Sequence, residues 1–132
     1  MSQENVEIVR QAFAAYASGG PEGLADFWHP EIEVEVPPGL AETGTYRGRE
    51  AVLAWMAEWT EAWERIEYTP EEVVGNGDTV VVTVLYDGIG KGSGLKIVDR
   101  FWYLLRLGDG KIVYIRLYGD RNEALEAAGL RE

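Results

Sequence analysis

An aspartate within an apolar, alternating run is the clearest candidate for chemistry in this sequence. In residues 98–107, VDRFWYLLRL, a β-strand would place alternate side chains on one face, namely Asp99, Phe101, Tyr103, Leu105 and Leu107. A carboxylate among such neighbours is costly unless it has a role. Removal from water would raise the pKa of Asp99 towards neutrality, so that it could take or return a proton beside a carbonyl. We therefore predict Asp99 as a catalytic acid and base.

Two tyrosines are candidates to assist this reaction. Tyr103 shares the predicted face with Asp99, and Tyr16 lies on the apolar stripe of the N-terminal helix. Either phenol could donate a hydrogen bond to a developing enolate oxygen. In the alternative interpretation, Asp99 lies hydrated at the mouth of a pocket or pairs with Lys96 or Arg100, and has no catalytic role.

The elements that must position these residues follow from hydrophobic periodicity and from turn residues. A helix begins near Ser2 and ends at Gly19-Gly20-Pro21, and a short one follows from Pro21 to about Trp28. The run Glu31–Val36 alternates as a strand does, and residues 37–48 are predicted to be a loop and a candidate pocket entrance. The remaining predicted elements are a helix at about 48–65, strands at about 66–74, 79–88, 95–107 and 111–118, and a helix at 121–128. This order indicates an α+β domain with an antiparallel sheet and helices on one of its faces.

The predicted helix at 48–65 carries a wide aromatic stripe that includes Trp55, Trp59 and Trp63. Such a stripe is typical of a helix that packs on a sheet, and Trp55 and Trp59 could also line a ligand cavity. His29 is the only histidine. It is either a surface turn residue or a residue at the pocket rim.

Length and composition limit the possible functions. The 132 residues predict one domain over 1–132, and the net charge of −11, from 12 basic and 23 acidic residues, disfavours nucleic acid and anionic membranes as partners. There is no cysteine, and no apolar run reaches the roughly 18 residues of a membrane helix. We expect a cytoplasmic protein with no metal and no cofactor.

The second face of the predicted sheet is too aromatic to stay in water as one patch. A homodimer that covers this face is the simplest physical answer. Its predicted contact residues are Val98, Trp102, Leu104, Tyr114, Arg116 and Tyr118.

Several phrases of the sequence resemble the SnoaL-like proteins of the nuclear transport factor 2-like superfamily, also called the cystatin-like cone. They are Tyr46–Val52, Asp109–Ile112, Tyr118–Arg121 and Glu123–Leu130. The resemblance covers essentially the full chain. It implies a cone, in which a strongly curved sheet wraps the N-terminal helix and the tryptophan-bearing helix around an apolar cavity. It implies little about the reaction, because the superfamily contains enzymes and pure binders.

Residue-by-residue comparison within that superfamily argues against two known activities. The chain is similar to ketosteroid isomerase around Val36, but Val36 stands at the position of the aspartate that acts as the base in that enzyme. Tyr103 stands at the position of its second catalytic aspartate. Leu117 stands where limonene-epoxide-hydrolase-like members have a catalytic aspartate. Both resemblances imply that Ile115 and Leu117 face the cavity. SnoaL-like aldol cyclases are similar in using an aspartate in an apolar cavity, which agrees with the role predicted for Asp99.

Three functions therefore stay open: a cyclase or isomerase acting on an apolar carbonyl compound, a non-catalytic binder of an apolar small molecule, and an accessory dimerisation domain with a filled interior. The residues predicted to contact the small molecule are Phe13, Trp28, His29, Val36, Trp55, Trp59, Tyr86, Phe101, Ile115 and Leu117.

Overall fold

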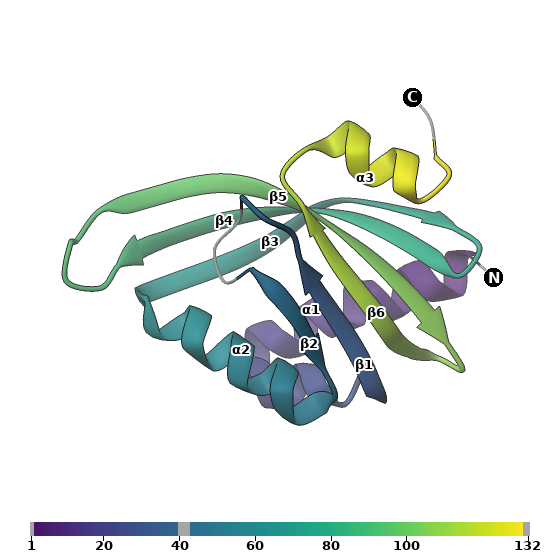
Figure 1. Ribbon diagram of the computed structural model, residues 1–132, viewed down its shortest axis with the longest axis horizontal. Helices are drawn as coiled ribbons and strands as arrows, with labels where there is room; N and C mark the ends of the chain where they lie inside the picture. Colours follow the sequence, from purple (N-terminus) through teal and green to yellow (C-terminus); the bar gives the residue numbers. More distant parts are fainter. Residues whose placement is uncertain (1, 40–42, 131–132) are drawn as a thin grey trace.

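A curved six-stranded sheet with two helices on its concave side forms the body of the protein (Figure 1). The computed structural model describes residues 2–39 and 43–130. In that part of the chain the elements follow in the order α1 Ser2–Ala25, β1 Trp28–Val36, β2 Gly44–Arg47, α2 Arg49–Glu61, β3 Trp63–Asn76, β4 Thr79–Gly90, β5 Lys96–Gly108, β6 Lys111–Tyr118 and α3 Arg121–Ala127. The predicted α+β cone is confirmed.

The sheet has the strand order β2-β1-β6-β5-β4-β3. The pairs are antiparallel except that β1 runs parallel to β6, with Trp28 opposite Ile112 and Val34 opposite Ile115. The sequence predicted an antiparallel sheet, because its hairpin turns are visible in the later strands, whereas the partner of β1 is set by long-range packing. The parallel pair brings the first strand beside the last one.

The N-terminal helical region has a break, as the sequence predicted. Gly20 has φ 68° and ψ −161°, a conformation open to glycine, and Pro21 begins the segment that continues to Ala25. The predicted second helix ends earlier than expected, because Trp28 already belongs to β1. The break lets α1 turn and cover the start of β1.

The predicted loop over residues 37–48 is partly regular. Residues 44–47 form the edge strand β2, in which Tyr46 pairs with Val34 of β1. Residues 40–42, which belong to the predicted pocket entrance, lie outside the described residues. Arg49, at the start of α2, donates hydrogen bonds to the carbonyl oxygen of Trp28, which ties α2 to the start of β1.

Helix α3 covers the face of the sheet opposite α1 and α2 (Figure 1). The carboxylate of Asp120 caps it by accepting a hydrogen bond from the backbone N–H of Glu123 at 3.2 Å. The helix buries Leu104, which is 1% exposed, with Val81 and Leu125 in a second, smaller core. The prediction that the helices share one face was wrong, because the apolar side of α3 needs a cover and the outer face of β4 and β5 supplies it.

The predicted dimer contact Leu104 is therefore also wrong, since α3 of the same chain covers this side chain. Trp102, Tyr114 and Tyr118 pack partly against the same core. The guanidinium of Arg116 lies 5.3 Å from the ring centroid of Tyr118. The dimer itself stays a prediction, for which Val98, Trp102, Tyr114, Arg116 and Tyr118 are the remaining contact residues on the outer face.

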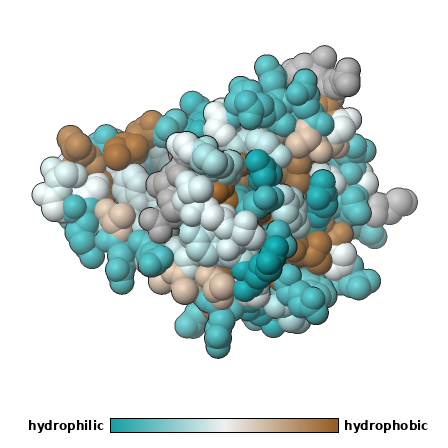
Figure 2. Space-filling model, viewed as in Figure 1, coloured by the Kyte–Doolittle hydropathy of each residue, from teal (hydrophilic) through white to brown (hydrophobic). Residues whose placement is uncertain are grey.

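The hairpin between β4 and β5 projects beyond the helices (Figure 1). We call residues 91–100 the exposed arm, because each of them is exposed. Leu95, Ile97 and Val98 are 64%, 42% and 56% exposed and form apolar patches at this end of the molecule (Figure 2). In the described residues, no helix is long and apolar enough to cross a membrane.

Candidate functional site

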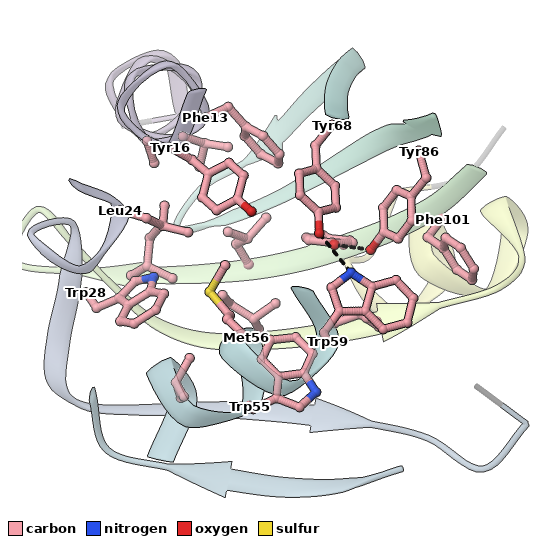
Figure 3. Close-up of a pocket in the computed structure, with 18 residues that line it drawn as sticks. Phe13, Tyr16, Leu24, Trp28, Trp55, Met56, Trp59, Tyr68, Tyr86 and Phe101 are labelled. Carbon is pink, nitrogen blue, oxygen red and sulfur yellow. Dashed lines mark hydrogen bonds between the residues drawn. The ribbon is translucent and has the colours of Figure 1, made fainter. Parts of the chain in front are cut away.

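A cavity of about 130 Å³ lies between α1, α2 and the concave side of the sheet. It is roughly ten times the smallest space that holds one water molecule. Its wall is formed by aromatic and aliphatic side chains from both helices and from five of the strands (Figure 3). The lining residues are Val9, Ala12, Phe13, Tyr16, Leu24, Trp28, Val52, Trp55, Met56, Trp59, Tyr68, Tyr86, Phe101, Tyr103, Leu105, Ile112, Ile115 and Leu117.

Most of the residues predicted for the site meet in this wall. Alternation along β5 and β6 brings Phe101, Tyr103, Ile115 and Leu117 to the concave face, and the ring of Tyr86 on β4 lies 4.8 Å from that of Phe101. The helices contribute Phe13, Tyr16, Trp55 and Trp59, and the start of β1 contributes Trp28. Three predicted residues do not line the cavity, namely Asp99, His29 and Val36.

The predicted position of Asp99 inside the cavity was wrong. Asp99 stands opposite Tyr86 in the β4–β5 ladder, so its side chain starts from the cavity-facing side of the sheet, as predicted. It belongs to the exposed arm, however, where neither α1 nor α2 covers the strand. One of its carboxylate oxygens accepts a hydrogen bond from the backbone N–H of Arg100 at 2.8 Å. The alternative interpretation, a hydrated carboxylate outside the pocket, fits this geometry.

His29 and Val36 lie outside the cavity wall for different reasons. The Nδ1 of His29 accepts a hydrogen bond from the backbone N–H of Glu31 at 3.0 Å, so the ring stabilises the start of β1. Val36 is buried, 3% exposed, in the main core at the other end of β1. It points to the concave face as expected but lies beyond the cavity wall.

Tyr68 is the most important site residue that sequence reasoning missed. It lies on β3 opposite Tyr86 of β4, and its ring is packed edge-on against that of Tyr86 with centroids 4.9 Å apart. A signal was present in the sequence, because Tyr68 stands between the polar residues Glu67 and Thr69 in a predicted strand. That alternation predicts an inward tyrosine.

The hydroxyl groups of Tyr16, Tyr68 and Tyr86 point toward one another (Figure 3). The hydroxyls of Tyr86 and Tyr103 are hydrogen-bonded to each other, and either can be the donor. The indole N–H of Trp59 donates to the hydroxyl oxygen of Tyr68 at 2.8 Å. Tyr16 packs edge-on against Tyr68, with ring centroids 5.2 Å apart. Together, Tyr16, Tyr68, Tyr86 and Tyr103 form what we call the phenol cluster.

Burial keeps the phenols of Tyr68, Tyr86 and Tyr103 neutral. It raises the pKa of Tyr103 to about 12, and it raises the pKa values of Tyr68 and Tyr86 well above the ordinary tyrosine value. Neighbouring phenols in the cluster raise the pKa values of Tyr68 and Tyr86 further. At neutral pH these groups are therefore hydrogen-bond donors rather than bases.

Counting protons shows that one phenol donor is left over. Tyr86 and Tyr103 together carry two hydroxyl protons, and their mutual hydrogen bond uses one of them. The second proton is available either to the oxygen of a neighbouring phenol of the cluster or to an acceptor in the cavity, because both side chains line it. A buried donor without an acceptor is costly, so this proton favours a ligand with an oxygen acceptor.

Two indole nitrogens of the wall also lack acceptors. The Nε1 atoms of Trp28 and Trp55 are buried without a hydrogen-bond partner. Within residues 2–39 and 43–130, no carboxylate, lysine, arginine or histidine lines the cavity. The polar side chains of the wall are therefore uncharged, and a charged ligand would find no opposite charge there.

Comparison with known proteins identifies relatives over nearly the whole chain. The model of the SnoaL-like domain family matches residues 9–115. The uncharacterized protein Rv0034 of Mycobacterium tuberculosis is 29% identical over 118 residues, which are 88% of this chain and 89% of that protein.

Solved structures agree with this family match. The crystal structure of an NTF2-like protein from Burkholderia xenovorans superposes with a TM-score of 0.75 and 31% identity, and covers 97% of each chain. A protein of unknown function with a cystatin-like fold from Xanthomonas campestris has a TM-score of 0.77 at 23% identity, over 99% of this chain and 100% of that one.

Proposed function

The chain belongs to the SnoaL-like domain family, and we propose that it binds a small, neutral, mostly apolar carbonyl compound in the cavity between α1, α2 and the sheet. The observation that carries this proposal is the combination of an open apolar volume with a wall whose polar groups are neutral donors. Apolar walls with a few convergent polar groups are typical of small-molecule sites. The leftover hydroxyl proton of the Tyr86–Tyr103 pair is the donor that would hold the carbonyl oxygen.

The net charge of −11 disfavours an anionic ligand. An anion would approach against the field of the whole protein and would lose its hydration in the cavity without a compensating cation. A cation would lose its hydration as well, and aromatic faces would be its only partners. A ketone loses little hydration free energy on entering the cavity, because its oxygen exchanges a hydrogen bond from water for one from a phenol.

An acid–base reaction on a carbonyl compound is the second candidate, and it is favoured by the position of Asp99 on the cavity-facing side of β5. Its carboxylate lies in the exposed arm, outside the cavity wall. A general base has to reach the proton that it removes, directly or through one water. Binding without acid–base chemistry by Asp99 is therefore the function that we place first.

Calorimetric titration with 1-tetralone and with its hydrocarbon analogue tetralin tests the binding proposal. The ratio of the two Kd values isolates the contribution of the carbonyl. We expect the double variant Tyr86→Phe/Tyr103→Phe to lose roughly 2- to 12-fold of the preference for the ketone, the value of one hydrogen bond. The double variant is needed, because either tyrosine alone retains a hydroxyl that can donate to the ketone.

Removing both partners of a buried hydrogen bond is nearly neutral for stability, so this variant should fold. Tyr118→Phe is the matched control, since Tyr118 does not line the cavity and packs beside α3. Failure of the wild-type protein to bind either compound would contradict the proposal. An unchanged ketone preference in the double variant would show that the tyrosine pair is not the recognising group.

A further inference from the structure

Residues 96–101 of strand β5 have a partner strand on one side only. Their ladder with β4 begins with Lys96 opposite Ile89, whereas the ladder of β5 with β6 begins only with Trp102 opposite Tyr118. In the part of the chain that the structure describes, no strand pairs with the other side of residues 96–101. Figure 1 shows this stretch in the arm that projects past the end of β6. We call this side of residues 96–101 the free edge.

The backbone groups that face the free edge belong to the even-numbered residues. The odd-numbered residues of β5 use theirs on the β4 side, since the carbonyl oxygen of Leu95 accepts a hydrogen bond from the N–H of Gly90 at 2.9 Å. Along an antiparallel strand these groups alternate between the two sides. The N–H and C=O groups of Lys96 and Val98 therefore point away from β4, toward the free edge.

The two outer strands of the sheet, β2 and β3, have features that prevent edge-to-edge pairing. β2 has only four residues, and β3 contains Pro70 with a register shift directly after it. The free edge of β5 has no such protection, and Ile97 and Val98 are 42% and 56% exposed there. The guanidinium of Arg100 is turned away from it, because it donates a hydrogen bond to Glu71 of β3 at 2.6 Å. The free edge is therefore suited to take up another strand.

We propose that the free edge pairs with the same edge of a second copy of the chain, antiparallel about a two-fold axis at Ile97. Two-fold symmetry keeps the faces of the two sheets matched, so only residues on the same face can stand opposite each other. With Ile97 opposite Ile97, Lys96 of each copy stands opposite Val98 of the other, and their backbone groups at the free edge bond to one another. This contact does not involve the cavity, so it is independent of the binding proposal.

The neighbouring registers are less favourable. An axis at Val98 would set Lys96 opposite Arg100, and it would need the backbone N–H of Arg100, which already donates to the carboxylate of Asp99 at 2.8 Å. An axis at Asp99 would set two aspartates opposite each other. Like charges directly opposite in a ladder are destabilising. The axis at Ile97 avoids both conflicts, and this self-complementarity favours a second copy over an unrelated strand.

Sedimentation equilibrium over roughly micromolar to millimolar protein concentrations measures this association. The dimer should be weak, because few residues take part. In Ile97→Lys two like charges would stand opposite each other at the axis, so the Kd of the dimer should rise by at least about 10-fold. Leu95→Lys is the matched control, since the same register sets residue 95 opposite Asp99 of the second copy. This control should dimerise as tightly as wild type or more tightly.

Single cysteines test the register directly, because the chain has none of its own. In Ile97→Cys the two thiols would stand opposite each other with their Cα atoms about 4.5 Å apart, which a disulfide can span. In Val98→Cys each thiol would stand opposite Lys96, and the two cysteines would be displaced by roughly 7 Å along the strands. With the same mild oxidant, Ile97→Cys should form a disulfide-linked dimer and Val98→Cys should not.

The altered side chains are exposed, so the variants should fold as the wild type does, which circular dichroism checks. A wild-type protein that stays monomeric up to millimolar concentration overturns the proposal. A dimer that Ile97→Lys leaves intact also overturns it, because the contact would then lie elsewhere, such as the outer face of the sheet. Equal weakening by Ile97→Lys and Leu95→Lys, or equal cross-linking of the two cysteine variants, would contradict the assigned pairing.

Discussion

The two halves of strand β5 have the same alternating sequence pattern but differ in burial. Residues 101–107 alternate between the cavity side and the face under α3, and Leu104, Leu105 and Leu107 are buried. Residues 96–100 continue the same alternation, yet each of them is exposed. The backbone pairing with β4 is continuous across both halves. The two halves differ because helices α1 and α2 cover only the first of them and end where the exposed arm begins (Figure 1).

This contrast teaches that alternation assigns a face but not an environment. Asp99 and Tyr103 start from the same side of β5, four residues apart, and only Tyr103 lines the cavity. The cost of desolvating a carboxylate is therefore not incurred at Asp99. The half of the strand that lines the cavity carries aromatic, phenol and aliphatic groups.

The largest expected effect compares a leucine in each half. Leu105→Ala removes a side chain that is 3% exposed and should destabilise the protein by about 2–5 kcal/mol. Leu95→Ala, next to β5 in the exposed arm and 64% exposed, should change the free energy of unfolding by no more than about 0.5 kcal/mol. Urea unfolding of both variants measures the difference. Similar losses in the two variants would mean that the arm is covered in solution.

A smaller effect is expected from the outer face of the sheet, which differs from the cavity in being charged. Glu35 accepts a hydrogen bond from the hydroxyl of Tyr114 and pairs with Arg116 at 3.1 Å. The hydrogen bond from Tyr114, followed by the interactions with Arg116, lowers the pKa of Glu35 below the ordinary glutamate value, although partial burial opposes this shift.

The sign of the resulting pH dependence follows from this lowered pKa. Between the folded and the ordinary pKa the unfolded chain binds more protons, so stability rises with pH. The contribution of Glu35 is complete above about pH 4.5 and is lost as the pH falls through the lower, folded value. Glu35→Gln should remove this dependence, at a loss of about 1 kcal/mol or less at pH 7, since the pair is partly exposed. Denaturant unfolding at pH 7 and pH 3 checks it, and a loss that is the same at both pH values would contradict the ion pair as its cause.

The smallest effect is expected for Asp99→Asn in the exposed arm. Stability should change by no more than about 0.5 kcal/mol, and the affinity for 1-tetralone should stay within about 2-fold of wild type, because Asp99 does not line the cavity. Calorimetric titration of the variant provides the measurement. A marked loss of affinity would bring Asp99 back as a site residue and would favour the acid–base candidate.

The sequence carried much of the fold and of the cavity wall, because both follow from local patterns. The run Val98–Leu107 showed which side chains share a face, and the stripe with Trp55 and Trp59 showed which helix packs on the sheet. The strand predicted at Lys111–Tyr118 has the same limits in the structure.

The parts that could not be predicted depend on contacts between distant segments. Three features of this kind are tertiary contacts that no local sequence pattern encodes. They are the parallel pairing of β1 with β6, the packing of α3 on the sheet, and the end of the helical cover near Phe101. The phenol cluster combines residues from α1, β3, β4 and β5, so its hydrogen bonds have no signature in any one segment.

A crystal of the wild-type protein soaked with 1-tetralone tests the central claim most directly. The account predicts the ring system between α1, α2 and the sheet, with the carbonyl oxygen at hydrogen-bond distance from the hydroxyl of Tyr86 or Tyr103. A carbonyl turned away from both hydroxyls, or a ligand bound only against the exposed arm near Asp99, would contradict it.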